Sequence, residues 1–220
     1  MEGFIEAVYD GYQKLNDDVY EFYLKVDDFD FEPGQFVTFM LKDDQGEFGR
    51  SYSIIDYREN QIIFCVKVLD EGRGSQALLK LKKGDVLPIT SAKGIFQVQK
   101  TGQPKLFVAN GVGIAPFIPM IQSIPDAKKT LILGCRYQTD LLYLDKLKKV
   151  PNLKLMISLT KPEKDWKGLT GRVTEILEKE TVEPETEVYI CGSADMIGDV
   201  IKHLNSIDHP KKHIFTEAFY

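Results

Sequence analysis

Cysteine and histidine are scarce in this chain of 220 residues, which contains three of each. The cysteines are Cys65, Cys135 and Cys191, spaced 70 and 56 residues apart, and no C-x-x-C pair occurs. An odd number of widely spaced cysteines predicts neither a metal cluster nor a disulfide framework. This pattern favours a reducing, cytoplasmic setting.

The chain also lacks long apolar runs and an excess of positive charge. No hydrophobic stretch approaches the roughly 20 residues of a membrane-spanning helix, and no basic segment followed by an apolar one opens the chain. The net charge of −5 argues against non-specific nucleic-acid binding, which depends on clustered lysine and arginine. The remaining composition is that of a globular protein, and the length suits one large domain or two small ones.

Residues 1–98 carry mostly strand signals. Segments rich in β-branched and aromatic residues are separated by Asp, Asn, Gly and Pro, as in FIEAVYDGYQ, VYEFYLKV, QFVTFML, RSYSIID and NQIIFCVKV. Strands at this spacing predict an antiparallel barrel or sandwich. One segment, RGSQALLKLKKGD, instead predicts a short helix that opens at Ser75.

Residues 99–220 alternate between buried-strand patterns and helical patterns. The strand-like runs KLFVAN, TLILGC, LKLMISLT and EVYICG are each followed by a segment that predicts a helix of roughly 10 to 15 residues. This alternation predicts an α/β domain with a parallel sheet covered on both faces, beginning near the polar stretch QKTGQPK. Such sheets bind ligands beyond the carboxyl ends of their strands, so the residues after each strand are candidates for a site.

Two motifs follow strands in this second half. In NGVGIAPF, Gly111 and Gly113 let the backbone approach an anionic ligand at the start of a helix. In CGSADM, Cys191 and Gly192 end a strand, and Ser193 is the expected N-cap of the next helix. A common strand-to-helix turn and a small buried cysteine explain the same residues without a ligand.

Two further motifs, RSYS and GRGS, lie in the first half. Arg50 could bind a phosphate through paired hydrogen bonds, and Tyr52 offers a flat ring to a planar ligand. Gly72, Gly74 and Ser75 could surround a phosphate at a helix start. Each motif alone is also explained as a turn or a strand end, but together they are two phosphate-type sites in one domain.

The order of these motifs resembles the ferredoxin–NADP reductase superfamily. A predicted barrel is followed by R-x-Y-S, G-x-x-S, G-x-G-I-A-P, C-G-x-x-x-M and a terminal aromatic residue, so the resemblance covers essentially the whole chain. CRYQTDLLYL, GLTGR and the EAFY end are most similar to compact bacterial ferredoxin/flavodoxin–NADP reductases. The resemblance implies an FAD-binding antiparallel β-barrel domain over residues 1–98. It also implies an NAD(P)-binding α/β domain with a C-terminal aromatic tail over residues 99–220.

The resemblance further implies roles for individual residues. Ser53 would bond the central flavin ring, Cys191 would stand beside the reacting nicotinamide, and Tyr220 would cover the flavin face; these three are the catalytic candidates, and no metal is expected. FAD would be bound by Arg50, Ser51, Tyr52, Ser53, Lys67, Val68, Gly74, Ser75 and Tyr220. The nicotinamide nucleotide would be bound by Gly111, Val112, Gly113, Arg136, Thr160, Lys161, Arg172, Cys191 and Gly192.

The cations near the nucleotide bear on the choice between NADPH and NADH. Arg136 and Arg172 match basic positions of NADP-using bacterial reductases, and a ribose phosphate needs such cations. An expected Ser-Arg pair appears here as Thr160-Lys161, and lysine cannot make the forked contact of arginine. The sequence favours NADPH and leaves NADH open.

The implied electron acceptor is a ferredoxin or a flavodoxin, which would dock on a basic patch such as KLKKGD or DKLKKVPNLK. Ordinary solvated lysine faces explain both segments equally well. One alternative is an NADH-dependent reductase component of an oxygenase or another multicomponent system, whose iron–sulfur cluster would be on a separate protein. An alternative of another class is a flavin-binding partner module without catalysis.

Overall fold

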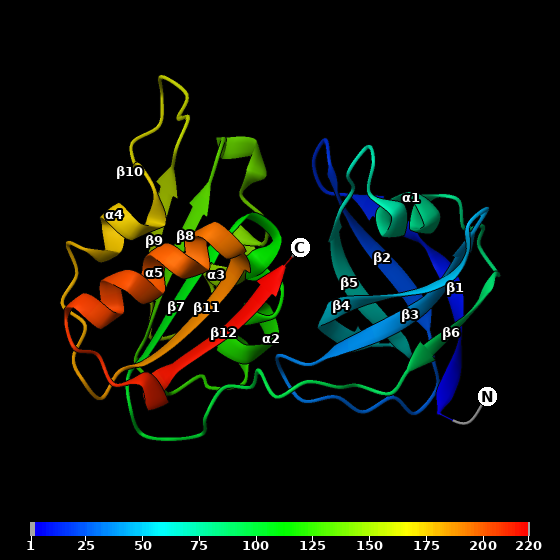
Figure 1. Cartoon of the computed structure of the whole chain (residues 1–220), viewed down its shortest axis with the longest axis horizontal. Coiled ribbons are helices and arrows are strands. Elements are labelled where there is room, and N and C mark those ends of the chain that lie inside the picture. Colours follow the sequence, from blue (N-terminus) through cyan, green and yellow to red (C-terminus); the bar gives the residue numbers. More distant parts are fainter. Residues whose placement is uncertain (1–2, 220) are drawn as a thin grey trace. The chain divides into compact units, whose positions relative to one another are not determined.

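The chain divides into two compact units, which meet in the sequence between Gln97 and Val98. A computed structural model describes residues 3–219, and Figure 1 shows the elements of each unit. The first unit consists of strands and one short helix, whereas strands and helices alternate in the second. Within residues 3–219, no helix combines the length and the apolar character that crossing a membrane requires.

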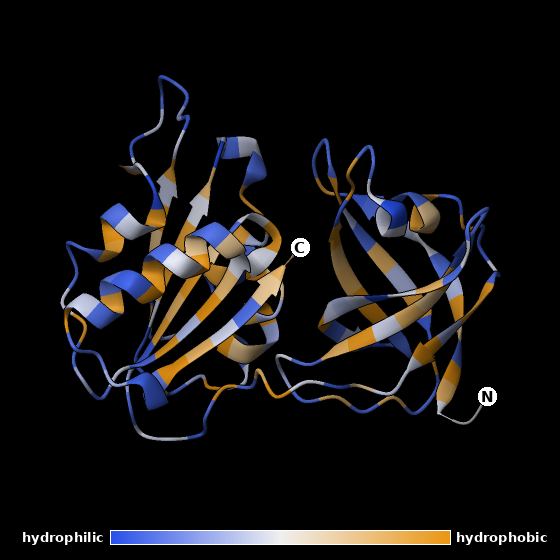
Figure 2. Ribbon diagram, in the orientation of Figure 1, coloured by the Kyte–Doolittle hydropathy of each residue, from blue (hydrophilic) through white to orange (hydrophobic). Residues whose placement is uncertain are grey.

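The first unit is a closed antiparallel barrel with the strand order β1-β2-β5-β4-β3-β6. Burial alternates along β3, as expected for a strand with one face toward an interior, and Figure 2 shows hydrophobic and hydrophilic residues mixed along the barrel strands. Phe22, Phe39 and Phe64 fill the interior, and the rings of Phe39 and Phe64 meet edge to face at 4.8 Å. The predicted β-barrel is confirmed, and its strands are β1 (Phe4–Lys14), β2 (Val19–Lys25), β3 (Phe36–Asp43), β4 (Gly46–Arg58), β5 (Gln61–Lys67) and β6 (Val86–Thr90).

The helix of this unit, α1 (Arg73–Leu79), begins earlier than predicted. Its N-cap residue is Gly72, so the prediction that Ser75 opens the helix is wrong. The Ser75 hydroxyl donates to the Gly72 carbonyl (3.1 Å) and accepts from the Leu69 N–H (3.1 Å). Ser75 is therefore in the first turn, where it closes the loop that leads into the helix.

The second unit is built on a six-stranded parallel sheet with the order β10-β9-β8-β7-β11-β12. β7 is the first strand of this sheet along the sequence. β8, β9 and β10 lie in turn on one side of it, and β11 and β12 lie on the other side. Open sheets of this type bind ligands where the order reverses, here between β7 and β11. The predicted parallel sheet is confirmed, and its strands are β7 (Lys105–Asn110), β8 (Lys129–Cys135), β9 (Leu153–Leu159), β10 (Leu169–Thr170), β11 (Glu187–Ser193) and β12 (Ile214–Phe219).

Helices cover both faces of this sheet. On one face, Leu106 and Val108 of β7 belong to a core cluster with residues of α4 (Val173–Leu177) and α5 (Ala194–Ser206). On the other face, the ring of Phe107 lies 5.0 Å from that of Phe117 in α2 (Phe117–Gln122). Coverage of both faces explains why β7 is hydrophobic without a break.

Most of these helices are shorter than predicted. α2, α3 (Leu144–Leu147) and α4 span six, four and five residues, and only α5, with 13, reaches the predicted length. Tyr143 interrupts the segment before α3, because its φ of 57° lies in the left-handed region. α2 ends ahead of Pro125, which disfavours helical backbone in the residue before it.

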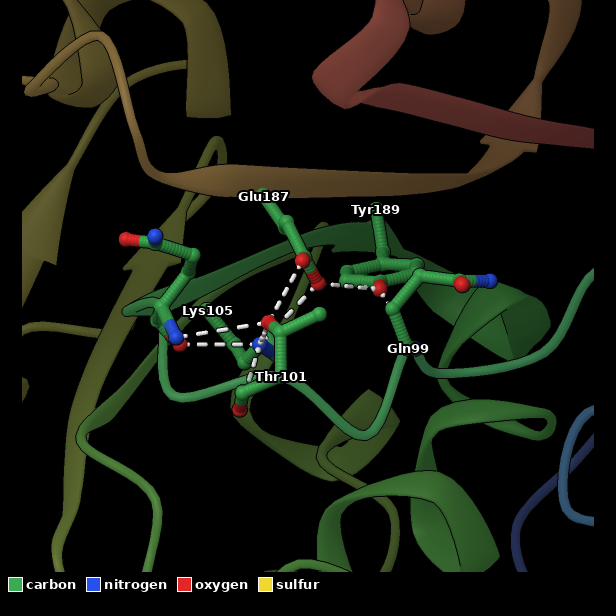
Figure 3. A network of polar contacts seen from close by, with 6 residues as sticks. Gln99, Thr101, Lys105, Glu187 and Tyr189 are labelled. Atoms are coloured by element: carbon green, nitrogen blue, oxygen red, sulfur yellow. Dashed lines mark hydrogen bonds and ion pairs between the residues drawn. The ribbon is translucent and has the colours of Figure 1, made fainter.

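The polar stretch QKTGQPK, predicted as a linker, is bound to the start of the sheet by a partly buried network (Figure 3). Glu187 accepts from the Thr101 hydroxyl (2.7 Å) and the Tyr189 hydroxyl (2.8 Å), and it lies 3.0 Å from the Lys105 ammonium. The Gln99 N–H donates to the Tyr189 hydroxyl (2.8 Å). Burial acts to raise the pKa of Glu187, but the hydrogen bonds from Thr101, Lys105 and Tyr189 outweigh it and lower the pKa.

Candidate functional site

Three of the predicted flavin-binding residues come together on the barrel, and we call Arg50, Tyr52 and Gly74 the barrel site. A β-carbon at Gly74 would lie 2.7 Å from the Tyr52 hydroxyl and 2.8 Å from Cγ of Arg50. The first turn of α1 can approach β4 this closely only because Gly74 has no side chain. Two motifs that are separate in the sequence therefore form one site.

The two side chains of the barrel site have complementary chemistry. Tyr52 packs on the interior ring of Phe39, with centroids 5.2 Å apart, and burial raises the pKa of its phenol to about 12. The exposed guanidinium of Arg50 lies over the Phe48 ring and donates to the Gly49 carbonyl (2.8 Å). Among residues 3–219, no carboxylate forms an ion pair with Arg50. A neutral ring thus lies beside a positive charge that remains available for an anion.

Arg73, which the sequence reasoning did not select, holds the barrel site together. Its guanidinium donates to both oxygens of Asp43 (2.6 and 2.8 Å) and lies 3.8 Å above the Phe48 ring. Hydrogen bonding to Arg73 lowers the pKa of Asp43 to about 2. This pair ties the start of α1 to the β3–β4 hairpin, and nothing in the local sequence indicates it.

The other predicted flavin residues of the barrel have contacts of their own. The Ser51 hydroxyl is 2.9 Å from that of Thr38, and Ser53 is buried farther along β4. Lys67 forms an ion pair with Asp18 (3.0 Å), and the Val68 N–H donates to the Asp18 carbonyl (2.6 Å). Lys67 and Val68 are therefore fixed to the start of β2. Tyr220 lies outside the described residues.

The predicted nucleotide-binding residues after β7 and β11 are in close contact, and we call Gly111–Gly113 with Cys191 and Gly192 the sheet site. A β-carbon at Gly113 would lie 2.7 Å from the carbonyl carbon of Cys191 and 2.8 Å from Cα of Gly192. The residues 111–114 form the short helix η1 directly after β7. Both loops therefore meet at the reversal of strand order, where ligand binding is expected.

Asn110, which the sequence reasoning did not select, lies next to the sheet site. Its Oδ1 accepts from the Ser193 N–H (3.0 Å), and its Nδ2 donates to the Ser193 hydroxyl (3.0 Å). Ser193 is the N-cap residue of α5, as predicted, but its side chain makes no capping hydrogen bond. The hydroxyl is used by Asn110 instead.

The thiol at the sheet site is buried. Cys191 has no exposed surface, and burial, with a smaller contribution from Glu217, raises its pKa well above the usual value. A thiol in this state is protonated at neutral pH and is a poor nucleophile. Its position suits a neutral contact rather than thiolate chemistry.

The predicted cations lie along the carboxyl edge of the sheet. Arg136 follows β8, Thr160 and Lys161 follow β9, and Arg172 is the N-cap residue of α4. The Lys161 N–H donates to the Arg136 carbonyl (2.9 Å), so these two loops are joined. No described carboxylate forms an ion pair with any of these three cations.

The loop after β9 also contains an acidic residue and the only tryptophan of the chain. Both carboxylate oxygens of Glu163 lie 3.2 Å from the Gln138 N–H, in the loop after β8. The Trp166 indole donates to the Leu169 carbonyl (2.8 Å). Trp166 is thus a fluorescent reporter on the loop that carries Lys161.

Comparisons with known proteins identify the two domains that carry these residues. The family model of the oxidoreductase FAD-binding domain matches residues 10–98, and that of the oxidoreductase NAD-binding domain matches residues 107–202. The chain belongs to the ferredoxin–NADP reductase superfamily. It therefore contains an oxidoreductase FAD-binding domain followed by an oxidoreductase NAD-binding domain, as the motifs predicted.

Among curated relatives of this superfamily, the chain is 28% identical over 209 residues to ferredoxin–NADP reductase B of Sorangium cellulosum, covering 86% of this chain and 85% of the relative. It is 26% identical over 199 residues to the toluate 1,2-dioxygenase electron transfer component of Pseudomonas putida, covering 86% of this chain and 59% of the relative. The chain thus spans about three fifths of that longer relative.

Solved structures show the same fold. A ferredoxin NADP+ reductase from Neisseria gonorrhoeae with bound FAD and NADP has a TM-score of 0.88 at 20% identity, and each chain is covered completely. The ferredoxin reductase in carbazole 1,9a-dioxygenase has a TM-score of 0.85 at 22% identity, covering 99% of this chain and 69% of the other.

The residues of the barrel site fit the cofactor that the FAD-binding family implies. The barrel site offers an aromatic ring, an unneutralised cation and a backbone segment without a β-carbon, which suit a planar ring with phosphates. When bound, FAD accepts and donates electrons, and the protein supplies binding and orientation. Among residues 3–219, no group of His, Cys, Asp and Glu side chains could hold a metal ion.

Proposed function

We propose that the protein transfers electrons between NAD(P)H, with NADPH preferred, and a ferredoxin or flavodoxin carrier through bound FAD. The observation that carries this proposal is that each oxidoreductase domain has a close approach at a predicted ligand-binding glycine, Gly74 on the barrel and Gly113 on the sheet. The relative from Sorangium cellulosum, which the chain matches over most of both lengths, has this activity in its name.

On the flavin side, Arg50 binds the pyrophosphate of FAD, and Tyr52 stacks on its ring system. Ser51 and Ser53 face the ring along β4, and Lys67 and Val68 border the ribityl or adenosine part. The backbone N–H groups of Gly74 and Ser75 donate to phosphate, while the Ser75 hydroxyl holds the loop. Tyr220 is proposed to cover the second flavin face.

On the nucleotide side, Gly111, Val112 and Gly113 support the nicotinamide nucleotide at the end of β7. Cys191 is a protonated, neutral contact of the nicotinamide, and Gly192 leaves room beside it. The 2′-phosphate of NADP is bound farther along the carboxyl edge of the sheet. The residues proposed to bind it are Arg136, Thr160, Lys161 and Arg172. Cations without carboxylate partners suit a phosphate better than a ribose hydroxyl.

The acceptor is proposed to be an acidic carrier protein, which a local basic surface would attract. Each of the two lysine-rich segments has one ion pair, between Lys83 and Asp10 (2.9 Å) in KLKKGD and between Lys154 and Glu180 in DKLKKVPNLK. The second segment is proposed as the docking surface, because three of its lysines, Lys146, Lys148 and Lys149, form no ion pair with a described carboxylate, against two in KLKKGD. We place this activity in the cytoplasm, since the three buried cysteines fit a reducing compartment.

A second candidate is an NADH-dependent reductase component of an oxygenase system, because dioxygenase components align over the same share of this chain. A test is the reduction of purified ferredoxin and flavodoxin by each nucleotide, followed through cytochrome c. Rapid turnover with NADPH and either carrier supports the proposal. Turnover with NADH alone supports the second candidate, and flavin reduction by neither nucleotide supports a non-catalytic partner module.

Replacing Arg50 by glutamine is expected to weaken FAD binding at least tenfold. Charge-assisted hydrogen bonds to phosphate contribute about 1.5–3 kcal/mol, and glutamine cannot replace the paired contact. The measurement is FAD affinity by fluorescence titration of the apoprotein. The matched control is Arg58→Gln at the end of β4, where Arg58 pairs with Asp56 at 3.7 Å. An affinity equal to that of the control variant would remove Arg50 from the site.

Replacing Arg172 by glutamine is expected to raise the KM for NADPH about tenfold and to leave that for NADH within about twofold, since one charge-assisted contact is lost. Binding of 2′-phospho-AMP and of AMP, measured through Trp166 fluorescence, gives an independent readout. Only the affinity for the 2′-phosphorylated compound should fall. Equal effects on both compounds would contradict a role in 2′-phosphate binding.

A further inference from the structure

Asn110 joins the two loops that form the sheet site. It is the last residue of β7, and its two side-chain hydrogen bonds reach Ser193 at the end of β11, 83 residues later in the sequence. β7 and β11 are the neighbouring strands between which the order of the sheet reverses. The Asn110 side chain therefore bridges the position at which such a sheet binds its ligand.

The backbone on both sides of this bridge is shaped to receive it. Gly192 has a φ of 149°, and a β-carbon built there would overlap Oδ1 of Asn110 and lie 2.8 Å from Cε of Met196. Gly113 packs on Cys191 and Gly192 in the same way from η1. The conformation of the turn 191–193 is thus specified by Asn110 and two glycines together.

The bridge also changes the start of α5. A serine at the N-cap position usually accepts a hydrogen bond from a backbone N–H of the first turn. Here the Ser193 hydroxyl accepts from Asn110 and forms no capping bond, so its side chain leaves the first N–H groups of α5 uncapped. Because α5 follows β11, these donors lie at the carboxyl edge of the sheet, on the side of the ligand.

We propose that Asn110 is a positioning residue for the nicotinamide nucleotide. It holds the turn 191–193 against η1. It also engages the Ser193 hydroxyl, so that this hydroxyl does not cap the first backbone N–H groups of α5 and these groups stay available to the bound nucleotide. This inference rests on the proposed function and deepens it, because it names Asn110 as the residue that fixes how the loops after β7 and β11 form the nucleotide site. Asn110 acts through Ser193 and has no part in FAD binding.

The test uses the full-length, FAD-loaded protein and three variants, Asn110→Ala, Ser193→Ala and the double variant. Stopped-flow reduction with NADPH gives the nucleotide Kd and the limiting rate of flavin reduction separately. Asn110→Ala removes two hydrogen bonds and is expected to raise the Kd about tenfold, whereas Ser193→Ala removes one and has a smaller effect. The double variant should be no worse than Asn110→Ala, because both changes break the same bridge.

Asn205→Ala is the matched control, since Asn205 is exposed on α5. FAD content and thermal stability should remain those of the control variant. An Asn110→Ala protein with an unchanged Kd would overturn the proposal. So would additive effects in the double variant, or a loss of FAD and stability in proportion to the loss of nucleotide binding.

The failure of this inference is distinguishable from failure of the proposed function. Binding of NADP+ is measured separately, through Trp166 fluorescence, without any electron transfer. A wild-type protein that binds NADP+ but whose flavin is not reduced contradicts the proposed function, and the Asn110 variants can still be compared. A wild-type protein that is reduced while all variants match it contradicts only the role of Asn110.

Discussion

Replacement of Gly113 by alanine is expected to slow the reduction of bound flavin by NADPH by about 100-fold, because a displacement of about 1 Å at a reacting site has effects of this size. The new methyl group would meet the backbone of Cys191 and Gly192, and backbone cannot move aside as a flexible side chain does. The two loops of the sheet site would separate, while the barrel site would be unaffected. The measurement is the limiting rate in anaerobic stopped flow.

Gly198→Ala is the matched control for this variant. A β-carbon at Gly198, in α5, has no atom within 4 Å, and alanine is favoured over glycine within a helix by about 1 kcal/mol. This control should reduce its flavin normally and unfold at a slightly higher temperature. A Gly113→Ala protein that reacts as fast as the control would show that the close approach of η1 to β11 has no role in the reaction.

Replacement of Lys105 by methionine is expected to destabilise the protein by about 3–5 kcal/mol, which is typical when one partner of a buried ion pair is removed. The Lys105 side chain has no exposed surface and that of Glu187 is 5% exposed, so the remaining carboxylate would be buried without its cation. The free energy of unfolding from urea titration, followed by circular dichroism, measures the loss.

The effect of Lys105→Met is also expected to depend on pH. Loss of Lys105 removes one hydrogen bond and one positive charge that lower the pKa of Glu187, so this pKa rises relative to the wild type and the folded variant binds a proton at a higher pH than the folded wild type does. The difference in the free energy of unfolding between the wild type and the variant is therefore larger at pH 7 than at pH 5, and it shrinks as the pH falls. The double variant Lys105→Met, Glu187→Gln should regain much of the stability, because no charge is left in the network. A single variant as stable as the wild type at pH 7 would contradict this interpretation of Figure 3.

The parts of the fold that could be predicted are those with a local pattern. Short runs rich in β-branched and aromatic residues, such as β2 and β5, indicated the barrel, and the hydrophobic run of β7 indicated a covered parallel strand. Gly74 and Gly113 could be selected because a glycine beside a strand or helix start often marks a close approach of the backbone. In both cases the structure shows such an approach.

The residues that could not be predicted act through partners distant in the sequence. Arg73 pairs with Asp43, Asn110 with Ser193, and Lys105 with Glu187, and in no pair does periodicity or spacing link the two residues. Helix ends were also misjudged, since the apolar pattern of the segment before α3 continues through Tyr143, which has left-handed backbone. Side-chain pairing across the fold, rather than local propensity, decided these features.

The central claim is that FAD on the barrel domain is reduced by a nicotinamide nucleotide held on the parallel-sheet domain. Its most direct test is an anaerobic titration of the purified protein with NADPH and, separately, with NADH, followed by flavin absorbance and by identification of the released cofactor. The expected result is release of FAD from the denatured protein and bleaching of the bound flavin at much lower concentrations of NADPH than of NADH. A protein that binds no added flavin, or whose flavin neither nucleotide reduces, would contradict it.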